Sequence, residues 1–114
     1  IYTSGTTGKP NGAAIRHRGV CNLALAQGSA FGIKDNTRVL QFASLAFDAS
    51  VSEIWCTLIQ GGCLFFPDNQ HPLIGDALTS FLNNHQIEVA TIPPSVLATM
   101  TPPEQSTLKT LIVA

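Results

Sequence analysis

The chain has 114 residues, of which 45% are apolar and 11% charged, so it is long enough for one packed domain and too apolar to be disordered. Its net charge of −1 and its lack of any basic run argue against binding to nucleic acid or to an anionic membrane surface. With no signal peptide and no apolar stretch near about 18 residues, we expect a cytoplasmic protein that does not span a membrane. Cys21, Cys56 and Cys63 lack paired or metal-like spacing, which predicts buried free thiols and no metal site.

The first part of the chain predicts a hairpin followed by a helix. Short strands over residues 1–4 and 13–16 flank a glycine-rich run, which is therefore expected at a hairpin-like turn. A helix is predicted over 18–30, because a glycine, Gly28 or Gly32, lies near its end and apolar residues recur with helical spacing. The apolar residues that give this spacing are Val20, Leu23, Ala24 and Phe31.

The middle of the chain predicts a strand over 38–44 and then a second helix. Ser50 and Glu53 form a Ser-x-x-Glu capping box that is expected to open this helix, and the glycine pair at 61–62 is expected to end it. The apolar residues on its predicted inward face recur every 3.6 residues and are Val51, Ile54, Trp55, Leu58 and Ile59.

The second half predicts a continuous apolar strand over 63–66 and four further elements. These are a helix over 76–86, a strand over 88–92, a short helix over 95–100 and a strand over 108–114. The inward residues expected on the 76–86 helix are Ala77, Leu78, Phe81 and Leu82. Alternating helices and apolar strands are typical of an α/β fold with a mostly parallel sheet flanked by helices.

The glycine-rich run carries the clearest chemical signal in the sequence. Gly5, Gly8 and Gly12 allow positive φ and a close approach of the backbone to a ligand, and hydroxyl side chains stand between them. The run is therefore suited to wrap an anion, although composition alone would also fit a mobile hairpin tip. It is not the phosphate loop of P-loop NTPases, because only two residues separate the glycines and Pro10 follows Lys9.

Residues 2–12, Tyr-Thr-Ser-Gly-Thr-Thr-Gly-Lys-Pro-Asn-Gly, closely resemble the phosphate loop of adenylate-forming enzymes, usually Tyr-Thr-Ser-Gly-Thr-Thr-Gly-x-Pro-Lys-Gly. One position departs from that pattern, because Asn11 stands where the family has lysine. The resemblance implies that the phosphates of ATP are bound by Thr3, Ser4, Gly5, Thr6, Thr7, Gly8 and Lys9.

A second motif follows the strand predicted over 38–44. Most aspartates before a helix act as its N-cap, but Ser50 and Glu53 are expected to cap this one and to leave Asp48 free. The Asp48 carboxylate is then predicted to face a ligand at the carboxyl edge of the sheet, where open α/β folds bind ligands. Phe47-Asp48-Ala49-Ser50 resembles the Phe-Asp-x-Ser motif of amino-acid-activating adenylation domains, in which the aspartate pairs with the α-ammonium group.

Together the two motifs resemble an adenylation domain of a nonribosomal peptide synthetase. The resemblance implies the large N-terminal domain of such an enzyme, with residues 1–114 as a partial AMP-binding domain truncated at both ends. Because the C-terminal subdomain would be missing, the chain alone is expected to be inactive, and no catalytic residue is assigned. The implied cofactors are ATP, Mg²⁺ held by ligands outside the chain, and phosphopantetheine on a peptidyl carrier protein domain that accepts the activated amino acid.

The resemblance also implies a substrate pocket and its occupant. Ser52 lies one helical turn after Asp48, so both side chains are expected to point to the same side. The implied substrate is L-tyrosine, because phenylalanine-activating domains commonly carry a tryptophan where Ser52 stands. For two of the residues, in the last strand, ordinary packing is the alternative. The substrate-binding residues implied by the resemblance are Asp48, Ala49, Ser52, Thr91, Ile112 and Ala114.

Two other functions remain open at the level of the sequence. An acyl- or aryl-CoA synthetase of the same superfamily is disfavoured by Asp48, since such an enzyme has no ammonium group to pair with a carboxylate. A non-catalytic remnant or binding module is favoured by Asn11, since the loss of a cation near the phosphates would weaken the use of ATP.

Overall fold

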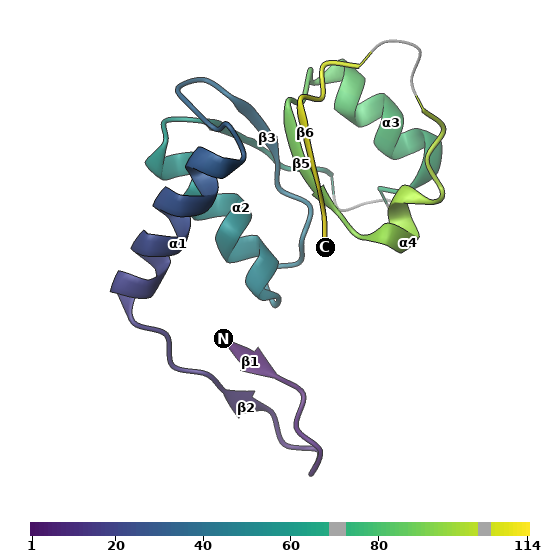
Figure 1. The fold of residues 1–114 in the computed structure, drawn as a ribbon. Coiled ribbons are helices and arrows are strands. Elements are labelled where there is room, and N and C mark those ends of the chain that lie inside the picture. Colours follow the sequence, from purple (N-terminus) through teal and green to yellow (C-terminus); the bar gives the residue numbers. More distant parts are fainter. Residues whose placement is uncertain (69–72, 103–105) are drawn as a thin grey trace.

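The computed structural model describes residues 1–68, 73–102 and 106–114, and its centre is a parallel β-sheet (Figure 1). The four strands run in the spatial order β4-β3-β5-β6. Their bounds are β3 (Arg38–Leu40), β4 (Cys63–Phe65), β5 (Val89–Ile92) and β6 (Thr110–Val113). The predicted α/β class with a parallel sheet is therefore confirmed, although the strand expected over 38–44 ends at Leu40, where the chain turns toward the next helix.

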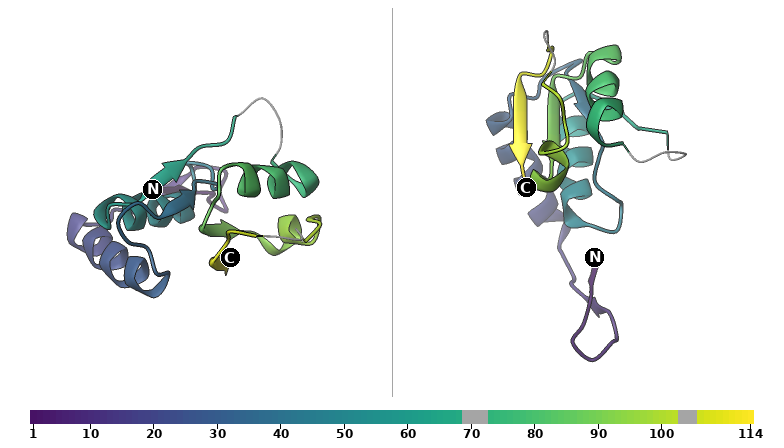
Figure 2. Two further views of the ribbon diagram at one scale, coloured as in Figure 1. Left: turned by 90° about the horizontal axis from the view of Figure 1, so that it is seen from above. Right: turned by 90° about the vertical axis from the view of Figure 1, so that its right-hand side faces the viewer.

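Helices cover both faces of the sheet. Helices α1 (His17–Ala30) and α2 (Asp48–Ile59) pack on one face, and α3 (Gly75–Asn84) with the short α4 (Pro94–Leu97) lies on the other (Figures 1 and 2). Because successive side chains of a strand point to opposite faces, the sheet contributes to two cores. Thus Val39 packs with the α1 and α2 side, whereas Leu40 packs with the α3 side.

The N-terminal segment forms the predicted hairpin, with β1 (Tyr2–Thr3) antiparallel to β2 (Asn11–Gly12). It extends away from the sheet and its helices (Figure 1). The strand expected over 13–16 is wrong, because β2 ends at Gly12. The register pairs Thr3 with Asn11, so residues 14–16 lie beyond Ile1, where the described chain has no partner strand for them.

Helix α2 begins differently from the prediction. Its N-cap is Phe47, without a side-chain cap, so the predicted capping box does not form. Ser50 lies inside the first turn and donates a hydrogen bond from its hydroxyl to the Phe47 carbonyl at 2.7 Å. Glu53 is 4% exposed and turns to the loop after β3 instead of back to the N-cap. A capping box needs the serine at the N-cap itself, and here the N-cap is Phe47, three residues earlier.

The predicted inward face of α2 is wrong at three of its five positions, while Val51 and Ile54 are partly buried. Trp55, Leu58 and Ile59 are 46%, 52% and 43% exposed, whereas the buried positions are small or polar. The helix is rotated so that Glu53 reaches the backbone after β3 and Cys56 packs on α1. Hydrophobic spacing alone could not fix this rotation, because a buried carboxylate with backbone partners can replace an apolar contact.

The remaining differences concern single residues and element ends. Helix α3 buries Leu78 and Leu82 as predicted and partly buries Phe81, but Ala77 is exposed. The short helix expected over 95–100 is one turn at Pro94–Leu97. All three cysteines are free as predicted, yet only Cys56 is buried, while Cys21 and Cys63 are exposed on the helix α1 and strand β4 surfaces.

Candidate functional site

A cavity of about 480 Å³ lies between α1, α2 and the carboxyl ends of β5 and β6. It is the place where helices and strand ends meet on one face of the sheet, which is where open α/β folds commonly bind ligands. All six residues that the sequence predicted for a substrate pocket line this cavity, namely Asp48, Ala49, Ser52, Thr91, Ile112 and Ala114.

Three elements bring these residues together. The first two turns of α2 supply Asp48, Ala49 and Ser52. Thr91 and Ile112 lie directly opposite each other in the parallel pairing of β5 with β6. Positions separated by 21 residues in sequence therefore form one continuous wall, because neighbouring parallel strands place paired residues side by side.

Asp48 is the first residue of α2 and is exposed at the cavity. It forms no hydrogen bond or ion pair with the described residues. Its carboxylate lies in the first turn of α2, beside the helix N-terminus. Asp48 is thus free of the capping role, as expected, but for a different reason: no side chain caps α2, and Ser50 and Glu53 serve other contacts.

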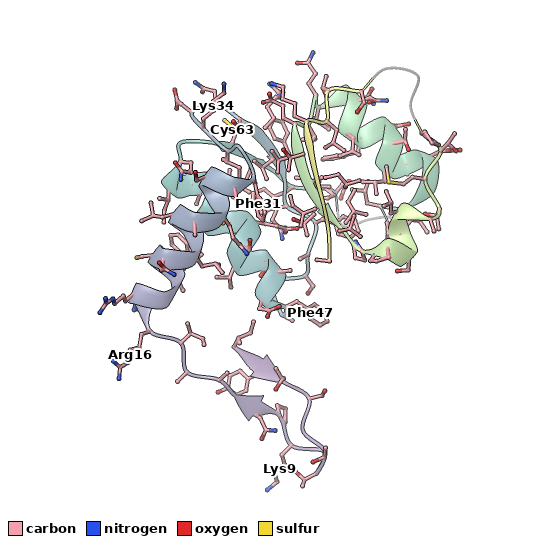
Figure 3. All side chains as sticks on the ribbon, in the orientation of Figure 1. Lys9, Arg16, Phe31, Lys34, Phe47 and Cys63 are labelled. Atoms are coloured by element: carbon pink, nitrogen blue, oxygen red, sulfur yellow. The ribbon has the colours of Figure 1, made fainter. Side chains whose placement is uncertain are left out.

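Helix α1 contributes a wall of the cavity that the sequence reasoning missed. The residues Gly19, Leu23, Gln27 and Phe31 all line it. Their spacing of four residues places them on one face of a helix, so the signal was present in the sequence. It could not show that this face meets the cavity, because that depends on how α1 packs against the sheet. Phe31 lies at the end of α1 (Figure 3), and its carbonyl accepts a hydrogen bond from the Thr110 hydroxyl at 3.0 Å.

A polar contact joins α1 to α2 beside the cavity. The Ser52 hydroxyl donates to Gln27 Oε1 at 2.5 Å, and the Cys56 thiol points to the same oxygen at 3.7 Å. Burial raises the pKa of the Cys56 thiol, so it remains a protonated donor at neutral pH. The helices approach closely here because Gly28 has no side chain: a Cβ there would lie 2.8 Å from Cγ of Gln60.

Glu53 anchors the loop that leads into α2. Its Oε2 accepts hydrogen bonds from the backbone N–H groups of Phe42 and Ala43, each at 3.0 Å, and from Nε2 of Gln41 at 3.2 Å. Burial raises the pKa of the Glu53 carboxyl, and these hydrogen bonds oppose that rise. The buried carboxylate thereby ties the end of β3 to α2 and fixes where Asp48 stands.

The glycine-rich loop is held in a conformation that needs its glycines. The N–H of Gly8 donates to the Gly5 carbonyl at 3.0 Å, and Gly8 has φ +80°, in the left-handed region. A Cβ on Gly5 would lie 2.1 Å from the Lys9 carbonyl oxygen, so no side chain fits there. The loop therefore presents its backbone closely packed on the inside and its polar groups outside.

Apart from the hydrogen bond between Gly8 and Gly5, many polar groups of this loop have no partner within the described part of the chain. The side chains of Thr3, Ser4, Thr6, Thr7 and Lys9 are exposed and form no hydrogen bond or ion pair there. The backbone N–H groups of Thr6, Thr7 and Lys9 likewise donate to none of the described residues. Such a set of free donors fits the oxygens of a phosphate chain. Lys9 lies at the outer end of the hairpin, and no residue of the loop lines the cavity (Figure 3).

Two further properties of the described residues bear on the site. No group of three or more histidine, cysteine, aspartate or glutamate side chains is arranged there to hold a metal ion. None of the described helices combines the length and the apolar character needed to cross a membrane.

The chain belongs to the AMP-binding enzyme family, whose model matches residues 1–113. It is 41% identical over 111 residues to nonribosomal peptide synthetase 4 of Gibberella zeae, a match that covers 97% of this chain and 1% of that protein. The chain thus spans a very small part of the length of this relative. The resemblance to adenylate-forming enzymes that the loop indicated is confirmed.

Solved structures of adenylation domains share the fold. The Vibrio cholerae adenylation domain AlmE, in complex with glycyl-adenosine-5'-phosphate, has a TM-score of 0.77 and 30% identity, covering 87% of this chain and 18% of that one. The N-terminal subdomain of Klebsiella oxytoca NpsA, with 3-hydroxybenzoyl-AMSN, has a TM-score of 0.67 and 34% identity, covering 82% and 23%. An artificial fusion of NpsA with the carrier protein ThdA has a TM-score of 0.68 and 34% identity, covering 82% and 18%.

Proposed function

We propose that this chain is the part of a nonribosomal peptide synthetase adenylation domain that holds the amino acid and the phosphates of ATP. The whole protein would convert an amino acid to its aminoacyl-AMP and pass it to a carrier protein as a thioester. The observation that carries the proposal is that Asp48 and the five other substrate-pocket residues implied by the resemblance line one cavity. Membership of the AMP-binding family also supports the proposal. So does the similar fold of AlmE, which was solved with an aminoacyl adenylate.

The glycine-rich loop is the proposed site for the phosphates. ATP, when bound, supplies the adenylyl group that the carboxylate of the amino acid takes up, with release of pyrophosphate. The loop would hold the phosphate chain with its free backbone N–H groups, its hydroxyls and Lys9. These donors offset the repulsion between two anions, carboxylate and triphosphate, that must come together for reaction. Mg²⁺ ligands belong to parts of the protein outside this chain.

Asp48 is the proposed partner of the α-ammonium group. A carboxylate at the cavity, free of hydrogen bonds to the described residues, is available to accept a charge-assisted hydrogen bond from that group. Pairing there would orient the substrate with its side chain toward Ser52 and the strand ends. An acyl-CoA synthetase would leave this carboxylate without a partner.

L-tyrosine is the proposed substrate, with L-phenylalanine second. Apart from Asp48, the walls are mostly small or apolar, which leaves room for an aromatic ring, and Ser52 offers a hydroxyl. The related NpsA subdomain was solved with 3-hydroxybenzoyl-AMSN, whose acyl group is a hydroxylated ring. A site built around a substrate hydroxyl can reject the analogue that lacks it by up to about 10⁴–10⁵.

A peptidyl carrier protein domain bearing phosphopantetheine is the proposed partner. The support is the NpsA fusion, in which a structurally similar adenylation domain was joined to a carrier protein.

ATP–pyrophosphate exchange by the complete adenylation domain, with each proteinogenic amino acid in turn, tests the proposed function. We expect the highest rate with tyrosine. The highest rate with an aliphatic or acidic amino acid would refute the aromatic substrate. No exchange with any amino acid would support a non-catalytic module, and thioester formation from coenzyme A with a simple carboxylic acid would support the acyl-CoA synthetase.

A further inference from the structure

The contact between Gln27 and Ser52 limits the chemistry that the cavity offers to a substrate. Two donors, the Ser52 hydroxyl and the Cys56 thiol, converge on Gln27 Oε1. In the structure the Gln27 amide presents its oxygen, which can only accept, to both groups. Gln27 and Ser52 are both partly buried and both line the cavity, so this contact lies at the wall that a bound side chain would meet.

The hydrogen bond to Gln27 determines whether the Ser52 hydroxyl can donate to a ligand or only accept from it. A serine hydroxyl has one hydrogen to donate and two lone pairs that accept. Because Ser52 gives its hydrogen to Gln27, the oxygen can only accept a hydrogen bond from a ligand. A substrate side chain that carries a donor satisfies this oxygen, whereas one that carries only an acceptor, or no polar group, leaves it unpaired on binding.

We propose that Gln27 is a positioning residue that selects substrates with a hydrogen-bond donor on the side chain, by holding the Ser52 hydroxyl as an acceptor. The inference rests on the proposed function and adds to it the direction of the hydrogen bond between Ser52 and the substrate, in which Ser52 accepts. It explains how a chain with a small polar residue at position 52 could favour a phenol over a plain phenyl ring. It also gives helix α1 a part in substrate choice, although neither sequence motif includes a residue of that helix.

The packing of α1 on α2 keeps Gln27 in reach of Ser52. At the next residue, Gly28, a Cβ would lie 2.8 Å from Cγ of Gln60 and 3.3 Å from the Cys56 carbonyl oxygen. The two helices are therefore close at the position where the side chains meet, and a short hydrogen bond can span them. The protonated Cys56 thiol completes the contact, because its sulfur lies 3.7 Å from Gln27 Oε1 and 3.7 Å from Ser52 Oγ.

The test compares Gln27→Leu with Gln27→Glu in the complete adenylation domain. The substrates are tyrosine, phenylalanine, 4-fluorophenylalanine and 4-aminophenylalanine, and the readouts are kcat and KM in pyrophosphate exchange. Leucine is apolar and cannot accept a hydrogen bond, so Gln27→Leu should lower the tyrosine to phenylalanine ratio of kcat/KM by roughly tenfold, through the KM for tyrosine. Glutamate keeps the acceptor and should hold the ratio within about threefold of the wild type.

The outcomes separate the two proposals. In the wild type, 4-aminophenylalanine should be used and 4-fluorophenylalanine rejected, since both are close to tyrosine in size and only the first carries a donor. Equal losses for tyrosine and phenylalanine in Gln27→Leu, or an unchanged ratio, would overturn the role of Gln27 and leave the proposed substrate standing. Equal use of 4-fluorophenylalanine and tyrosine by the wild type would also overturn the role proposed for Gln27. A wild type that activates neither aromatic amino acid would overturn the proposed substrate and this inference together.

Discussion

The buried carboxylate of Glu53 gives the sharpest prediction for the scaffold of the site. Glu53→Ala removes the acceptor of two backbone N–H groups, those of Phe42 and Ala43. A buried donor left unpaired costs about 1–3 kcal/mol, so these two partly buried donors together would cost at most about 2–6 kcal/mol. Part of this is offset because alanine no longer buries a carboxylate, whose desolvation is what raises the pKa of Glu53. We therefore expect a net loss of about 2–4 kcal/mol in the free energy of unfolding.

The matched control is Glu53→Gln, which keeps one oxygen acceptor and removes the charge. It should cost less than about 1 kcal/mol at neutral pH. The assay is urea unfolding of the complete adenylation domain for the wild type and both variants. The KM for the amino acid should also rise in Glu53→Ala, because the loop that sets Asp48 loses its anchor. A Glu53→Ala variant as stable as Glu53→Gln would show that the loop does not depend on these hydrogen bonds.

The raised pKa of Glu53 also predicts that the free energy of unfolding depends on pH. The pKa of Glu53 is raised in the folded state above its ordinary value of 4.5, so between those two pKa values the folded state binds more protons than the unfolded state. The contribution of Glu53 to stability therefore falls as the pH rises through this window. The stability of Glu53→Gln relative to the wild type should increase with pH across the window and then level off. A difference that does not change with pH would contradict the raised pKa.

Three further predictions concern the cavity and the loop, all measured by pyrophosphate exchange on the complete domain. Asp48→Ala should lower kcat/KM for the amino acid by a factor equivalent to about 2–5 kcal/mol, with little change in ATP binding. Unchanged kinetics would show that Asp48 does not bind the substrate. Gly5→Ala should raise the KM for ATP, since its Cβ would lie 2.1 Å from the Lys9 carbonyl oxygen; a normal KM for ATP would show that the loop can shift at no cost. Asn11→Lys should improve the use of ATP by at most about 1.5–3 kcal/mol, and no gain would mark position 11 as peripheral.

Much of the site could be predicted from the sequence because its signals are local. The glycine loop is set by steric limits within a few residues: Gly8 must adopt φ +80°, and Gly5 has no space for a side chain. The class of fold follows from short apolar strands alternating with helices, which bury a parallel sheet on both faces. Asp48 and Ser52 share a helical face by spacing alone, and both line the cavity.

Only the tertiary structure decided how the helices turn and what they meet. The apolar spacing of α2 predicted that Trp55 would be buried, but the structure turns Glu53 inward, where it accepts hydrogen bonds from two backbone N–H groups, and Trp55 is 46% exposed. The hydrogen bond from Ser52 to Gln27 joins residues 25 positions apart and depends on the close approach of α1 at Gly28. The sequence by itself therefore determined which residues are available to the site, because spacing and steric limits act locally. Their hydrogen-bonding state was decided by packing between elements, since each donor is committed to whatever acceptor the fold brings within reach.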